Sequence, residues 1–175
     1  LMTNEELSEL EQKALPGCGA CNLLGTANSM NFLTEALGLC LPGATAPAMG
    51  SRKTMLAKRS GMKIMELLEK GITARQVLTE EAIYNALVVD MAIGGSSNTM
   101  LHLAAICNEA DLPFSFDQVE EIAAKVPHFV KLKPAGIHYP ADFDEAGGVG
   151  ALMNRLKGYG LLKDNMTVTA KTVFE

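Results

Sequence analysis

Residues 79–107, "TEEAIYNALVVDMAIGGSSNTMLHLAAIC", predict two helices joined by a glycine turn, the second of them buried. Thr79 followed by two glutamates is typical of a helix start. The apolar residues of the first helix recur at helical spacing: Ile83, Leu87 and Met91. Gly94 and Gly95 end this helix. The second helix follows at once from Ser96 and is apolar on nearly every side, which predicts that it lies inside a core.

Similar patterns precede this pair. Thr3 and Glu6 have the spacing of a capping box that begins a helix. Pro16–Gly17 is predicted to end this helix. A second helix, capped by Asn28 or Ser29, carries three apolar residues on one face and ends at Gly38. Those residues are Met30, Leu33 and Leu37.

A longer helix is predicted from a cap at Ser51 to Gly71. Its charged residues form a solvated face, and its methionines and one leucine face inward as core filling. The inward residues are Met55, Met62, Met65 and Leu68.

The carboxyl-terminal part is predicted to contain both helices and a strand. Asp117 and Glu120 form a second predicted capping box, and Pro127 ends that helix. "HFVKL" at 128–132 alternates and is the best candidate strand. A further helix carries Val149, Leu152 and Leu156, and residues 167–173 fit either a strand or a helix start.

Composition limits the function classes. The 175 residues are 48% hydrophobic, which fits one globular domain, and the formal net charge is −5. Without a basic face, nucleic-acid binding is not expected. No apolar run is long enough to span a bilayer, and the acidic, amphipathic start is unlike a signal peptide. Four cysteines are too few for a disulfide framework, so a reducing cytoplasm is the default.

Cys18 and Cys21 lie in "PGCGACNLLGTANSM", residues 16–30, and leave several interpretations open. A redox pair would follow a strand, and a zinc site needs four ligands; neither requirement is met by the neighbouring pattern. Buried thiols in a tight turn are a third interpretation. A fourth is one ligand of an iron–sulfur cluster, because glycines and the amino end of the next helix suit a negatively charged group.

"IGGSSNTM" at 93–100 is a second candidate site. Free amides and hydroxyls of Ser96, Ser97 and Asn98 can hold a carboxylate or phosphate. The alternative is a helix stop followed by a Ser/Asn cap.

The histidines are less informative. His138 lies near Asp142, Asp144 and Glu145, which suits acid–base or metal chemistry or, alternatively, a surface loop. His102 is predicted to be a hydrogen-bonded core residue.

Three stretches together resemble the dihydroxy-acid dehydratase family, which also contains sugar-acid dehydratases. They are "PGCGACNLLGTANSMNFLTEALGLCLPG", "VDMAIGGSSNTMLHLAAICNEA" and "VPHFVKLKPAGIHYPADFDEAGGVGALMNRL", in the family's order. The resemblance is closer to the branched-chain enzymes than to phosphogluconate dehydratases.

The resemblance implies removal of water from a 2,3-dihydroxy acid to give a 2-keto acid. It implies a [2Fe–2S] or [4Fe–4S] cluster, of which Cys21 would be one ligand and Cys18 only a neighbour, and a Mg²⁺ ion. The expected pathway is branched-chain amino-acid biosynthesis, for isoleucine and valine, in the cytoplasm. The only other partners expected are the rest of its own chain and a second copy in a homodimer.

The resemblance also implies that residues 1–175 are one segment of a cluster-binding N-terminal domain, with no catalytic residue of its own, the other ligands and the C-terminal domain lying elsewhere. Such a segment is expected to be inactive and to bind no cofactor when isolated. The implied fold is α/β: a helix-rich segment of a three-layer α/β/α domain with a parallel sheet. A sugar-acid dehydratase and a non-enzymatic helical interaction module with methionine-rich faces remain the alternatives.

Overall fold

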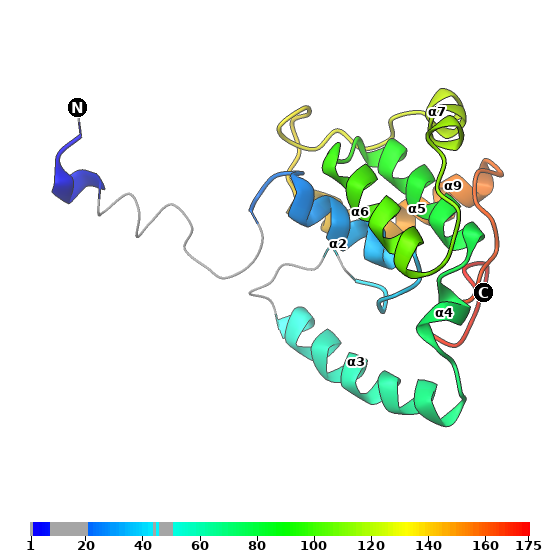
Figure 1. The fold of residues 1–175 in the computed structure, drawn as a ribbon. Coiled ribbons are helices and arrows are strands. Elements are labelled where there is room, and N and C mark those ends of the chain that lie inside the picture. Colours follow the sequence, from blue (N-terminus) through cyan, green and yellow to red (C-terminus); the bar gives the residue numbers. More distant parts are fainter. Residues whose placement is uncertain (1, 8–20, 44, 46–50) are drawn as a thin grey trace.

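The computed structural model describes residues 2–7, 21–43, 45 and 51–175. Helix α5 lies at the centre, and α2, α6, α7 and α9 pack against it (Figure 1). The helices of this part of the chain are α2 (Thr26–Ala36), α3 (Ser51–Glu69), α4 (Ala74–Val77), α5 (Glu80–Ile93), α6 (Asn98–Glu109), α7 (Phe116–Lys125), α8 (Pro140–Glu145) and α9 (Gly148–Gly158).

The core forms around α5 because this helix is apolar on all sides. Ten of its 14 residues are buried, so every neighbouring helix finds an apolar surface on it. Each neighbour contributes fully buried or nearly fully buried side chains: Phe32 and Leu33 from α2, Leu103 from α6, Ile122 from α7, and Val149 and Leu156 from α9. The predicted faces of α2 and α9 are confirmed by the burial of Leu33, Leu37, Val149, Leu152 and Leu156.

Both predicted ends of α5 are confirmed. The Thr79 hydroxyl accepts a hydrogen bond from the backbone N–H of Ala82, at 3.3 Å, and so caps the helix. Gly94 has φ 66°, the left-handed conformation that glycine adopts without strain. The capping box of Thr3 and Glu6 is confirmed too, by reciprocal bonds of 2.8 and 3.2 Å. The predicted helix end at Pro16–Gly17 lies outside the described residues.

The predicted cap of α2 is wrong by three or four residues. Gly25 is the N-cap, and both Asn28 and Ser29 lie inside the helix and are buried. The Asn28 amide is engaged with the preceding loop instead of capping the helix. In α7 the cap residue is Ser115, and Asp117 lies within the first turn, so that predicted capping box is wrong as well.

Helix α6 is not enclosed on all sides as predicted. Only Thr99, Leu103 and Cys107 are buried, on the face toward α2 and α5. Leu101 is 69% exposed, and His102 is exposed instead of lying in the core. Apolar composition therefore overstated the burial of a helix that packs at the edge of the bundle.

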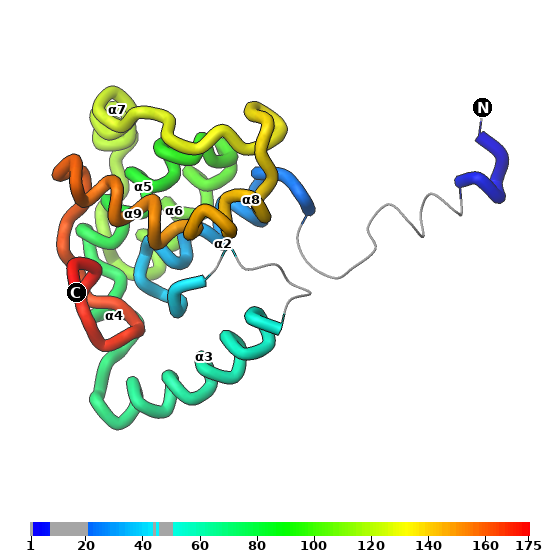
Figure 2. The backbone as a smooth tube through the Cα atoms, turned by 180° about the vertical axis from the view of Figure 1, so that it is seen from behind, coloured from blue at the N-terminus to red at the C-terminus, as the bar shows by residue number. Residues whose placement is uncertain are grey.

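Helix α3 departs furthest from prediction. It runs along the outside of the bundle, separate from the helices around α5 (Figure 2). Leu67 is its one buried residue, and Ser51 is its first residue and not a preceding cap. The four side chains predicted to face inward are 56–73% exposed: Met55, Met62, Met65 and Leu68.

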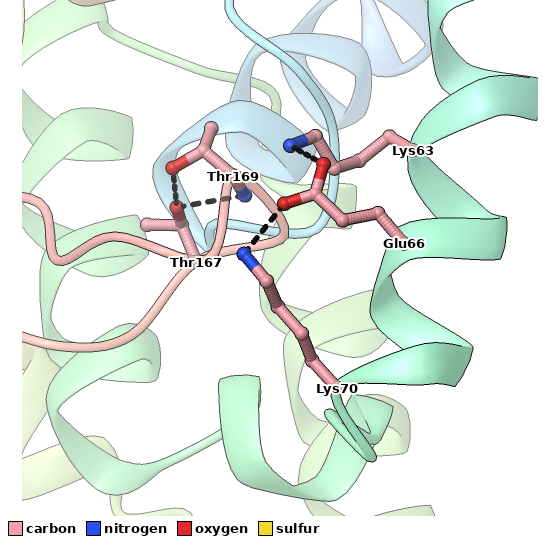
Figure 3. A network of polar contacts seen from close by, with 5 residues as sticks. All are labelled: Lys63, Glu66, Lys70, Thr167 and Thr169. Atoms are coloured by element: carbon pink, nitrogen blue, oxygen red, sulfur yellow. Dashed lines mark hydrogen bonds and ion pairs between the residues drawn. The ribbon is translucent and has the colours of Figure 1, made fainter.

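Polar contacts lie near both ends of α3, and those of Arg52 join the helix to α8. Both guanidinium nitrogens of Arg52 donate to the buried Asp144 carboxylate of α8, at 2.8 and 2.9 Å. Near the other end, Glu66 lies between Lys63 and Lys70, beside the turn in which the Thr167 and Thr169 hydroxyls pair (Figure 3). These two lysines lower the pKa of Glu66 to about 2.

The described residues contain two isolated β-bridges and no longer strand. In the predicted strand at 128–132, the Phe129 and Val130 amides donate to the Ala92 carbonyl at the end of α5. That segment therefore lies against a helix end, and only Leu132 forms a bridge, with His138. Residues 167–173 form turns with a bridge between Met166 and Thr172. The three-layer α/β/α fold with a parallel sheet stays a prediction.

No helix in the described ranges is long and apolar enough to cross a membrane.

Candidate functional site

Cys21 lies in an exposed loop that is fixed from two sides. The Asn28 side chain of α2 donates to the carbonyls of Cys21 and Leu23, both at 2.7 Å. The Leu24 amide donates to the carbonyl of Lys133, from the segment after α7, at 2.6 Å. The thiol is free, and its Sγ is 3.8 Å from the Leu23 carbonyl oxygen. A free thiol is thus held at the surface on a well-anchored backbone.

Gly25 separates the Cys21 loop from α2. Its backbone is extended, so glycine is not needed for a left-handed conformation. A β-carbon there would lie 3.8 Å from Cys21 Sγ and 3.4 Å from Leu23. The glycine therefore keeps one side of the sulfur open.

The turn at residues 94–98 packs directly against the start of α2. The Ser96 amide donates to Ser29 Oγ at 3.0 Å, and Ser96 Oγ is 3.0 Å from Thr26 Oγ1. The Asn98 amide group donates to the same Thr26 hydroxyl at 2.9 Å. The amino ends of α2 and α6 thereby lie side by side.

These contacts bring together the two candidate regions that lie about 75 positions apart in sequence. The α2 residues that hold the Cys21 loop and those that hold the turn share one helical turn: Thr26, Asn28 and Ser29. Ser97 and Asn98 are exposed beside them, and the Ser97 side chain does not cap α6. Two helix amino ends and several hydroxyls at one place favour a negatively charged ligand.

The other described cysteines differ from Cys21. Burial, and secondarily the negative charge of Glu35, raises the pKa of Cys40 to about 12, although Lys53 opposes the rise. Cys107 is buried in the core, and burial raises its pKa too. Neither thiol is suited to act as a thiolate ligand, since both resist deprotonation. Cys18, Gly17 and Gly19 lie outside the described residues.

His138 belongs to an exposed loop. Its Nδ1 is 3.8 Å from Asp142 Oδ2, and Asp142 accepts a bond from the Tyr139 amide at the start of α8. Asp144 faces the other way, toward Arg52 and Thr45. This arrangement supports the surface-loop interpretation over an acid–base or metal group.

The fit of a metal centre depends on Cys21. In the part of the chain that is described, no three His, Cys, Asp or Glu side chains gather closely enough to hold a metal ion. Cys21 is nevertheless free, exposed and next to a positively polarised helix end, as one ligand of a shared iron–sulfur cluster must be. The described residues fit a cluster only as contributors of one thiolate.

Several residues of this site were not singled out from the sequence. Thr26, Ser29 and Asn28 look like ordinary helix-start residues, and only packing shows what they bind. Asp90 had a signal that was overlooked, because it is the one acid inside the apolar run "NALVVDMAI" at 85–93. His128 has no such signal; its ring lies over Gly94, with Nε2 3.3 Å from the Ile93 carbonyl.

Comparison with known proteins places this chain among dehydratases. Residues 1–175 match the family described as dihydroxy-acid/6-phosphogluconate dehydratase N-terminal. Proteins named dihydroxy-acid dehydratase from Clostridium novyi and Pyrococcus furiosus are each 50% identical, over 100% and 99% of this chain. The one from Caldicellulosiruptor bescii is 52% identical over 99%. The chain spans about a third of these relatives' length, 32% in each case.

A family match over the whole chain identifies the class: a segment of the amino-terminal region of a dehydratase-family protein. The chain belongs to the dihydroxy-acid/6-phosphogluconate dehydratase N-terminal family.

Proposed function

We propose that this chain is part of a dihydroxy-acid dehydratase, which converts a 2,3-dihydroxy acid into a 2-keto acid. Three relatives that share about half of its residues carry that name. The observation that carries the proposal within the chain is Cys21, a free and exposed thiol on a loop fixed by Asn28 and Lys133.

In this proposal Cys21 supplies one thiolate ligand to a [2Fe–2S] or [4Fe–4S] cluster. When bound, such a cluster supplies a Lewis acid for the leaving hydroxyl group. The other ligands, and those of the Mg²⁺ ion, lie outside the described residues. Asn28 keeps the Cys21 backbone in place, and Gly25 leaves the sulfur accessible.

The turn at residues 94–98 is the proposed contact for the anionic end of the substrate. Ser96 and Asn98 are already aligned by Thr26, while the Ser97 hydroxyl remains exposed next to them. The adjoining amino ends of α2 and α6 favour a carboxylate there. A dihydroxy acid is a small carboxylate, so substrate and site match in charge.

The wider setting is proposed on the same basis. We expect a cytoplasmic homodimer that serves isoleucine and valine biosynthesis, built on a three-layer α/β/α domain, with no nucleic-acid or membrane partner. A sugar-acid dehydratase of the same family is the second candidate, because the family description includes 6-phosphogluconate dehydratases. Assaying the full-length protein with 2,3-dihydroxyisovalerate and with aldonic acids separates the two.

The decisive experiment is Cys21→Ser in the full-length protein, with iron and sulfide content and dehydratase rate measured anaerobically. We expect severe loss of both, because a serine hydroxyl is a poor ligand for iron in such clusters. Cys40→Ser is the matched control and should retain the cluster, since the Cys40 thiol resists ionisation. A Cys21→Ser protein with normal cluster content would refute the proposal.

The 175-residue chain alone should show no turnover after anaerobic cluster assembly, because one cysteine cannot hold a catalytic cluster. Dehydration of 2,3-dihydroxyisovalerate by the isolated chain would contradict the assignment of the remaining ligands to other parts of the protein.

A further inference from the structure

Asp90 is a buried acid with an incompletely satisfied carboxyl group. It lies in the last turn of α5 and is 3% exposed. Its Oδ1 has no hydrogen-bond partner. A β-carbon at Gly95 would overlap Oδ1, so the carboxyl group is packed against the backbone of the 94–98 turn. An ionised oxygen in such a place would carry a large desolvation cost.

The neighbouring threonine shows where a proton is needed. Thr99 Oγ1 lies 2.6 Å from the Ser96 carbonyl oxygen and 2.7 Å from Asp90 Oδ2. Both distances are those of hydrogen bonds, but a hydroxyl group has one proton to donate. If Asp90 were ionised, one of these pairs would consist of two oxygens with no proton between them. A protonated Asp90 completes both bonds.

The groups around Asp90 favour the neutral form. Helix α6 contributes the Thr99 hydroxyl, and α2 contributes the Ser29 hydroxyl, which lies near the same side of Gly95 as the Asp90 carboxyl group. The segment after α7 contributes His128, whose Nε2 contacts the Ile93 carbonyl. Among the described residues, no cation forms an ion pair with this carboxylate.

The pKa of Asp90 is shifted upward, which favours the protonated form. Burial raises it to about 6, and the Thr99 hydrogen bond opposes that rise. Thr99 lowers the pKa of Asp90 only while its hydroxyl donates to the carboxylate. When Thr99 donates to the Ser96 carbonyl instead, the charged form of Asp90 loses that stabilisation.

We propose that Asp90 is a protonated positioning residue that donates to Thr99, so that Thr99 donates to the Ser96 carbonyl and fixes the 94–98 turn on α2. The 94–98 turn also holds Thr26 and Ser29, which share one helical turn of α2 with Asn28, the residue that holds the Cys21 loop. The link to the Cys21 site rests on the proposed function. The protonation of Asp90 does not.

The test compares Asp90→Asn with wild type in the full-length protein. Asparagine keeps the shape and offers an N–H donor to Thr99, but it cannot ionise. Because the native state holds a proton that the unfolded state releases, wild type should lose stability relative to Asp90→Asn as the pH rises from 5 to 8. The difference in melting temperature between the two proteins is the measured quantity. Asp117→Asn, at an exposed acid, is the control and should give a difference that does not change over this range.

Infrared spectroscopy reads the proton directly. The wild-type minus Asp90→Asn difference spectrum at pH 6 should contain the C=O stretch of a protonated carboxyl group. Absence of that band, or a melting-temperature difference that is flat between pH 5 and 8, overturns the proposal. So does an Asp90→Asn protein that is destabilised as strongly as Asp90→Ala at every pH.

These readouts separate the two proposals. If the proton signature is present while Cys21→Ser leaves the cluster intact, the proposed function fails and the protonated Asp90 stands. If the signature is absent while Cys21→Ser abolishes the cluster, the protonated Asp90 is refuted and the proposed function stands.

Discussion

Helices α5 and α3 both carry apolar residues at helical spacing, yet one is enclosed and the other is exposed. Ten of the 14 residues of α5 are buried, against Leu67 alone in the 19 residues of α3. Helix α5 contains no Lys or Arg, whereas α3 carries charges throughout and is attached to α8 through Arg52. A periodic apolar stripe therefore shows that a helix has an apolar face, but not which other element, if any, packs against that face.

Side-chain truncation should give the largest contrast between the two helices. Leu87→Ala in α5 should lower the free energy of unfolding by about 2–5 kcal/mol, because a fully buried leucine leaves a cavity. Met62→Ala in α3, where the side chain is 66% exposed, should change it by less than about 0.5 kcal/mol. Urea unfolding of both variants measures the contrast. Equal losses would mean that α3 is packed against a partner surface.

The polar attachment of α3 is tested next. Arg52→Ala should cost about 1–2 kcal/mol, because among the described residues it leaves the buried Asp144 carboxylate with the Thr45 hydroxyl as its one side-chain partner, although the guanidinium is partly exposed. Arg75→Ala is the matched control, because its partner Asp111 is itself exposed. This substitution should cost about 1 kcal/mol or less. Unfolding free energies that rank the two arginines the other way would show that Asp144 does not anchor α3.

A smaller effect is expected at the start of α5. Thr79→Ala should cost about 1 kcal/mol, because the Ala82 amide loses its acceptor. Thr79→Ser keeps the hydroxyl and serves as the control, with most of the stability retained. Thermal unfolding of the two variants is sufficient. A loss in Thr79→Ser as large as that in Thr79→Ala would indicate that the methyl group matters, and not the cap.

The smallest expected effect has the opposite sign. Gly61 lies within α3, and a β-carbon there would meet nothing within 4 Å. Gly61→Ala should therefore raise stability by about 0.5–1 kcal/mol through better helix propensity. Circular dichroism during thermal unfolding measures the gain. No gain, or a loss, would show that α3 is not helical at this position or is contacted there.

Much of the helical pattern could be predicted from local sequence. The Thr79 cap, the Gly94 stop and the buried faces of α2 and α9 follow from rules that act within a few residues. The errors fell where a distant contact competed with a local preference. Asn28 would be a good cap, but the carbonyls of the Cys21 loop engage its amide, and residues 128–132 alternate like a strand but bond to the end of α5.

The candidate site shows the same division. Cys21 and the 94–98 turn were each recognisable as short polar or glycine-rich interruptions of apolar helices; the local pattern suggested anion binding at the turn, and the resemblance to a family assigned a role to Cys21. Their proximity was not predictable, because it depends on how α2 packs against α6. Asp90 needed both kinds of information, since its charge stands out in the sequence but its missing partner is visible only in the packed core.

The amino-acid sequence by itself determined where most helices begin and end and the family to which the chain belongs. It also determined which residues of α2, α5 and α9 are apolar. Those properties depend on backbone propensity, short-range capping and residue identity. Only the tertiary structure decided that α3 lies outside the bundle, that one turn of α2 holds both the Cys21 loop and Ser96, and that Asp90 Oδ1 lacks a partner among the described residues. Burial and hydrogen-bond pairing between distant residues are properties of the packed chain, because they depend on which surfaces exclude water from one another.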